Sequence, residues 1–87
     1  MAKNNNITSL RVKLPEFLYC FQCLYQNNLI DNEEKNDLVE SLRDCLSEET
    51  GAKKNLTIRL QNIFYQPELP MTFKQQVENL LYYINNQ

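Results

Sequence analysis

Apolar side chains recur every three or four positions along four stretches of the chain, and short polar or proline-containing links separate these stretches. This spacing puts the apolar side chains of each stretch on one face of a helix. The pattern predicts helices at about residues 15–27, 32–50 and 53–65, and a fourth from residue 72 onward. The predicted core faces, in chain order, are Phe17, Leu18, Phe21, Leu24 and Tyr25; Leu38, Val39, Leu42, Cys45 and Leu46; Leu56, Leu60, Ile63 and Phe64; and Phe73, Val77, Leu80, Leu81 and Ile84.

The links contain residues that favour the start or the end of a helix. Asp31 or Asn32 can cap the second helix, because a short polar side chain accepts a hydrogen bond from a free backbone N–H at a helix start. Gly51 is a suitable residue just past the end of that helix. Thr72 and Gln75 have the spacing of a capping box for the fourth helix.

Residues 1–13 are predicted to form a flexible or extended arm, and residues 14–87 a single helical bundle domain. The part from Ile7 to Lys13 is also compatible with a short helix that leads to Pro15, which suits a first helical turn. One glycine among 87 residues argues against a many-stranded β fold, because such folds need frequent turns. The predicted fold is therefore all-α, a compact bundle of about four amphipathic helices with an N-terminal arm.

Charge is distributed unevenly along the chain. Residues 31–49 hold eight carboxylates and two basic side chains, which gives this segment a net charge of −6. The remaining residues carry +4, so the whole chain has a net charge of −2. A chain polarised in this way can attract a charged partner, and self-association as a homodimer is an open alternative.

Most of this acidic charge follows one stripe of the predicted second helix. At about 100° per residue, five carboxylates fall within an arc of about 80°. Neighbouring like charges on a helix destabilise it by about 0.2–0.5 kcal/mol per pair. Two interpretations remain, a solvated face and a surface that binds another protein with a basic surface. The residues of this acidic stripe are Glu33, Asp37, Glu40, Asp44 and Glu48.

Three tyrosines are predicted to lie opposite the apolar faces of their own helices. They are Tyr19, Tyr65 and Tyr82, and Ile58 shares the outward side of Tyr65. Exposed tyrosines are enriched where proteins bind each other. They are therefore predicted to form a contact surface, unless one of these helices is buried all round.

A basic cluster of Lys53, Lys54 and Arg59 near the start of the third helix predicts an alternative site for an anion or a nucleic acid. Cations at this end oppose the helix dipole, and two lysines beside free backbone amides would bind phosphate. About twenty residues around Gly51 resemble a helix-turn-helix, with Leu60 in place. Thr57 departs from that motif because an apolar residue is expected there. Protein binding is preferred because the chain is acidic overall.

The remaining candidate chemistry lies in three cysteines, Cys20, Cys23 and Cys45. Cys20 and Cys23 form a C-x-x-C motif, but a helix start at Pro15 removes the activation that a helix N-terminus gives such thiols. A structural zinc site needs four ligands, and the chain has no histidine. Cys20 and Cys45 are therefore expected in the core and Cys23 at the surface. No metal site, cofactor or enzyme activity is predicted, and a thiol or metal protein remains a third class.

We expect a cytoplasmic protein without a signal peptide or membrane span. The preferred function is that of a small non-enzymatic module for protein–protein interaction, such as an adaptor, an inhibitor or a regulatory subunit. Its acidic stripe would orient a basic partner and its tyrosines would add contact energy.

Overall fold

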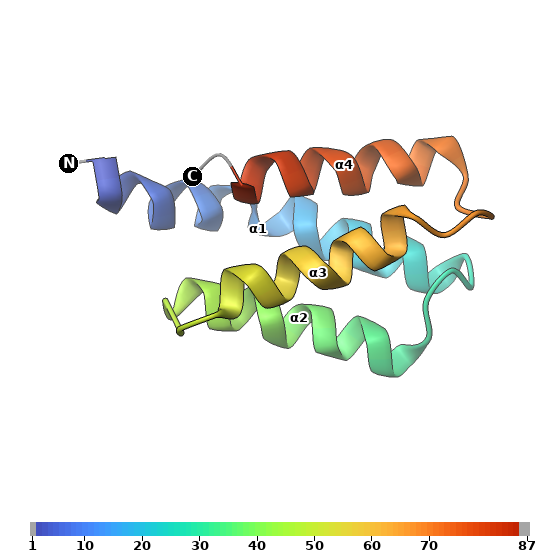
Figure 1. The fold of residues 1–87 in the computed structure, drawn as a ribbon, viewed down its shortest axis with the longest axis horizontal. Helices are drawn as coiled ribbons and strands as arrows, with labels where there is room; N and C mark the ends of the chain where they lie inside the picture. Colours follow the sequence, from blue (N-terminus) through green and yellow to red (C-terminus); the bar gives the residue numbers. More distant parts are fainter. Residues whose placement is uncertain (1, 86–87) are drawn as a thin grey trace.

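The computed structural model describes the backbone of residues 2–85 and the side chains of residues 10–85. Four helices account for most of this part of the chain, and it contains no strand (Figure 1). They are α1 (Ala2–Gln26), α2 (Asn32–Leu46), α3 (Ala52–Phe64) and α4 (Met71–Asn85). The prediction of an all-α bundle of four helices is confirmed. None of the described helices is long and apolar enough to cross a membrane.

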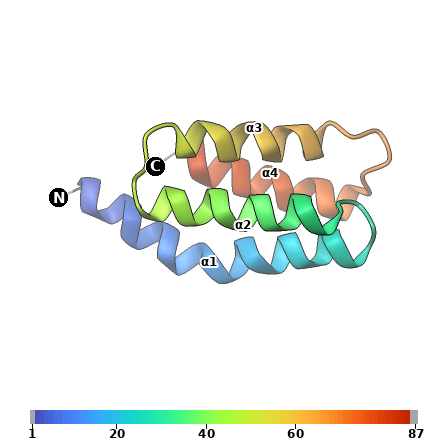
Figure 2. The same cartoon turned by 90° about the horizontal axis from the view of Figure 1, so that it is seen from below.

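Consecutive helices run in opposite directions, as both views show (Figures 1 and 2). The links between helices are short, and short links allow a chain to return only beside the helix that it has just left. Each helix packs against the next one in the chain, and α4 also packs against α1. The four helices therefore enclose one core along the axis of the bundle.

The core consists of apolar side chains from all four helices. At its centre the rings of Phe17 and Phe21 pack edge to face, with their centroids 6.3 Å apart. The predicted apolar faces are buried or partly buried, except that Leu18 on α1 is 42% exposed. The largest fully buried side chains are Phe17, Phe21, Leu24, Leu38, Leu42, Leu56, Leu60, Ile63 and Val77.

The N-terminal arm is helical rather than extended. Helix α1 starts at Ala2 and continues through Pro15, so the prediction that the first helix starts at Pro15 was wrong. The first turns of α1 project beyond the other three helices (Figure 1). Proline lacks a backbone N–H and therefore weakens a helix in which it lies. The axis of α1 changes direction in the part that contains Pro15 (Figure 2).

Helix α2 confirms one predicted end and corrects the other. Asp31 caps its start, because the Asp31 carboxylate accepts a hydrogen bond of 2.8 Å from the backbone N–H of Glu34. The helix ends at Leu46, five residues before Gly51. Glu48 takes the left-handed conformation that ends the helix, with φ of 57°. Gly51, with φ of 80°, lies directly before α3.

Helix α4 starts at Met71, so the predicted capping box at Thr72 and Gln75 does not mark its start. The backbone carbonyl of Pro70 accepts the first helical hydrogen bond of 2.9 Å, from the N–H of Lys74. Thr72 is an exposed residue of the first turn. Pro70 therefore takes the N-cap position, two residues before the N-cap that the capping pattern predicts at Thr72.

Replacing Glu48 by glycine is expected to stabilise the bundle by about 1 kcal/mol, because only glycine takes the left-handed conformation without a steric cost. The neighbouring variant Glu49→Gly removes the same charge without relieving a positive φ, and is expected to be neutral or destabilising. Urea unfolding at pH 7 measures both. Equal midpoints for the two variants would contradict the assignment of strain to Glu48.

Candidate functional site

The acidic stripe lies on the outer side of α2, on the side nearer to α3. Glu33, Glu40 and Glu48 are exposed, and Asp37 and Asp44 are partly buried. Glu48 follows the end of α2, so four of the five predicted residues lie on the helix itself. Asp37 forms an ion pair within the chain, whereas no basic side chain of residues 10–85 pairs with the other four.

Arg59 of α3 reaches across to α2. Its Nη1 atom lies 3.5 Å from Oδ2 of Asp37 and 3.8 Å from Oε1 of Glu34. All three side chains are about one third exposed, so each pair contributes at most about 1 kcal/mol. Within residues 10–85, the buried Nε of Arg59 has no hydrogen-bond acceptor. One member of the predicted anion site therefore contacts the predicted partner-binding stripe.

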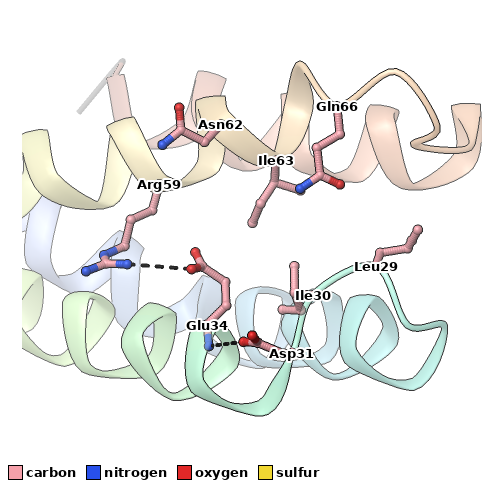
Figure 3. A pocket seen from close by; sticks show the side chains of 8 residues that line it. All are labelled: Leu29, Ile30, Asp31, Glu34, Arg59, Asn62, Ile63 and Gln66. Atoms are coloured by element: carbon pink, nitrogen blue, oxygen red, sulfur yellow. Dashed lines mark hydrogen bonds and ion pairs between the residues drawn. The ribbon is translucent and has the colours of Figure 1, made fainter.

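A cleft of about 340 Å³ lies beside this ion pair, between α2, α3 and the link that precedes α2 (Figure 3). Leu29, Ile30 and Ile63 provide its apolar wall. Its polar groups are the side chains of Asp31, Glu34, Arg59, Asn62 and Gln66. Two carboxylates against one guanidinium make the cleft acidic, and it holds no nucleophile or imidazole. The cleft is therefore suited to binding a cationic group.

A partly buried hydrogen bond joins α2 to α3. Ser41 is 3% exposed, and its Oγ atom accepts a hydrogen bond of 3.1 Å from Nδ2 of Asn55. One helical turn further along, Arg59 follows Asn55 on α3 and Asp37 precedes Ser41 on the antiparallel α2. The same register of the two helices therefore brings Asn55 to Ser41 and Arg59 to Asp37. Sequence reasoning missed Ser41, because a serine among acidic residues gives no signal of burial.

The basic cluster does not form one surface. Lys53 and Lys54 are exposed at the start of α3, while Arg59 is directed toward the carboxylates of α2. The charge of Lys53 influences the neighbouring thiol of Cys45. The pKa of Cys45 is raised, mainly by burial and also by Asp44, and Lys53 partly opposes this rise. Within residues 10–85, Arg59 pairs with two carboxylates, so only Lys53 and Lys54 of the basic cluster lack a carboxylate partner.

The three predicted tyrosines are exposed, at 65% for Tyr19, 73% for Tyr65 and 71% for Tyr82. Ile58 is 45% exposed. They lie in two places. Tyr19 and Tyr82 lie beside adjoining hollows between α1 and α4, whereas the ring of Tyr65 packs edge to face on Phe64 at the end of α3. A single tyrosine surface is therefore not formed.

The cysteines are free thiols with different environments. Cys20 is 2% exposed, and burial raises the pKa of its thiol to about 12, with a smaller contribution from Cys23. Cys23 and Cys45 are half-buried. A hydrogen bond to Cys23 raises the pKa of the Tyr19 hydroxyl. Within the described residues, no three Cys, Asp or Glu side chains lie close enough together to hold a metal ion.

Comparison with known protein families, curated proteins and solved structures finds no match to this chain.

Alkylation by iodoacetamide at pH 8.5 is expected to modify Cys23 and Cys45 in the folded protein and to leave Cys20 unmodified. A thiol with a pKa of about 12 is almost wholly protonated at this pH, and the thiolate is the reactive form. Peptide mass spectrometry after timed quenching measures each site. In urea all three thiols should react at similar rates, and early modification of Cys20 without urea would contradict its burial.

Proposed function

We propose that this chain is a small protein-binding module, and that the outer face of α2 binds a basic segment of another protein. The proposal rests on one observation above all. Among residues 10–85, Glu33, Glu40, Asp44 and Glu48 have no basic partner, although α3 places Arg59 beside Asp37. Carboxylates that remain unpaired on one helix face attract a cationic surface and orient its approach.

The acidic cleft of Figure 3 supports the same class of partner. A lysine or arginine side chain has an apolar stem and a charged end. The cleft offers Ile30 and Ile63 to such a stem and the carboxylates of Asp31 and Glu34 to the charged end. In the free protein, Arg59 pairs with Glu34 at the edge of this cleft. A cation of the partner would compete with Arg59 for the Glu34 carboxylate.

Exposed apolar side chains on α3 would add contact area to this electrostatic attraction. Ile58 and Tyr65 lie on the outer side of α3, next to the face that α3 turns toward α2. Charged groups at the rim of an interface mainly accelerate and orient association, whereas buried aromatic groups contribute most of the affinity. A partner that contacts both helices would therefore combine steering with affinity.

Capture from an extract of the native host, with the immobilised protein at low and at raised salt, tests the proposal. The double variant Glu40→Lys/Asp44→Lys is expected to lose the captured partner, and the partner retained by the unchanged protein should elute as salt is raised. These two positions avoid Asp37, whose replacement would also remove the ion pair with Arg59.

The matched control is Glu68→Lys/Glu78→Lys, which changes the net charge equally at exposed residues outside α2. It is expected to retain the partner. Equal loss from both double variants would mean that only the total charge matters. Equal retention by both would show that the acidic stripe does not bind the partner, and would overturn the proposal.

A further inference from the structure

The ion pairs of Arg59 lie within the surface that the proposed function assigns to a partner. Among residues 10–85, Arg59 is the only basic side chain that pairs with a carboxylate of α2. It pairs with Asp37, which belongs to the acidic stripe, and with Glu34, which lines the cleft of Figure 3. The protein therefore holds a cation of its own where the proposed function places a cation of the partner.

The geometry of these ion pairs is that of a loosely held guanidinium. Nη1 of Arg59 lies 3.5 Å from Oδ2 of Asp37 and 3.8 Å from Oε1 of Glu34. Strong hydrogen bonds between a guanidinium and a carboxylate are shorter, at about 2.7–2.9 Å, and often come in parallel pairs. The buried Nε of Arg59 has no acceptor among residues 10–85. Arg59 therefore partly neutralises the two carboxylates without forming its strongest possible contacts with them.

Water also reaches all three side chains of this cluster. The exposed fraction of the side chain is 31% for Arg59, 33% for Glu34 and 38% for Asp37. Ion pairs with this exposure are weak because water competes for both charges. The apolar side chains that pack α2 against α3 are fully buried and do not need these charges. Arg59 can therefore leave the carboxylates while the two helices stay together.

We propose that Arg59 is an autoinhibitory side chain, which occupies part of the acidic site in the free protein and must be displaced before a basic partner binds there. This inference rests on the proposed function and concerns the regulation of the same site. A group that blocks a site lowers the apparent affinity by the fraction of molecules in which the site is free. Two weak pairs keep Arg59 in place in most molecules, so its removal is expected to raise the affinity about three- to tenfold.

Competition by Arg59 also defines the kind of partner that the site favours. An isolated cation gains little by displacing Arg59, because one positive charge replaces another on the same carboxylates. A segment with several basic side chains also reaches Glu40 and Asp44, which have no basic partner within residues 10–85. These additional contacts are made within one complex and outweigh the cost of displacement. Arg59 therefore selects a run of basic residues over a single one.

Two nearby lysines show that this role is particular to Arg59. Lys35 also belongs to α2, but its Nζ atom lies 4.6 Å from the ring centroid of Tyr25 and 3.4 Å from Oε1 of Gln22. Lys54 is exposed in the first turn of α3 and pairs with no carboxylate of residues 10–85. Lys54 therefore provides a control with the same charge on the same helix.

Fluorescence anisotropy with a labelled oligolysine peptide tests the inference. About nine lysines in extended form span roughly 30 Å, which is enough to follow the whole of α2. The variant Arg59→Gln is expected to bind this peptide about three- to tenfold more tightly than the unchanged protein does. The matched control Lys54→Gln removes the same charge, and should tighten binding by about twofold at most because salt screens distant charges.

A side-chain NMR signal follows the displacement in the unchanged protein. The Nε–H group of Arg59 is buried, so its proton is shielded from exchange with water. It should therefore give a cross-peak in a proton–nitrogen correlation spectrum, and the variant Arg59→Lys, which has no guanidinium, identifies that cross-peak by its loss. Saturating oligolysine is expected to shift or broaden the cross-peak as the guanidinium leaves the carboxylates. This readout remains valid even if Arg59→Gln is unstable in urea unfolding.

Two results would overturn the inference and leave the proposed function in place. They are equal tightening by Arg59→Gln and Lys54→Gln, and an unchanged Arg59 cross-peak when the peptide is bound. The double variant Glu40→Lys/Asp44→Lys detects failure of the proposed function itself. It should lose oligolysine binding, whereas its matched control outside α2 should keep most of it. Equal loss from both double variants would overturn the proposed function and, with it, the role of Arg59.

Discussion

The whole arrangement depends on burial of the α1 side chains that follow Pro15. Phe17 and Phe21 are fully buried and pack edge to face, and α1 is the helix that contacts both the second and the last helix of the chain. In a domain of this size a single core provides most of the stability, so the large aromatic side chains at its centre matter most. Every candidate surface is held in place from this core, because the outer face of each helix is fixed only when its inner face is packed.

Register then decides which outer side chains meet. The hydrogen bond from Asn55 to Ser41 adds to the apolar packing that sets the height of α3 against α2. A shift by one turn would carry Arg59 away from Asp37 and would close or remove the neighbouring cleft. The partly buried pair of Ser41 and Asn55 thus lies in the same α2–α3 seam as the ion pair of Arg59. The acidic stripe is only partly available to a partner, because Asp37 is already paired with Arg59.

The sequence predicted the class of fold, the core faces and the exposure of the tyrosines, since all three follow from the helical repeat. It placed the ends of the first and third helices within one residue but missed the end of α2, because Glu48 rather than Gly51 takes the left-handed conformation there. It also could not show that Arg59 turns toward α2, or that Tyr19 and Tyr82 share a groove while Tyr65 lies elsewhere. Those relations depend on which helices are neighbours. Periodicity gives each helix its inner side but does not give the order of the helices around the core.

The proline within α1 divides that helix into parts with different roles in folding. The carbonyl of Arg11 would normally accept a hydrogen bond from the residue at position 15, and proline has no N–H to donate. The missing bond weakens α1 between its first turns and the bundle, although Leu10 and Leu14 still anchor the part before Pro15 to the core. Amide exchange in these turns would be governed by local fraying, while exchange around Phe17 and Phe21 would report global unfolding. Leu10 therefore marks the point on α1 from which amide exchange should follow the bundle rather than local fraying.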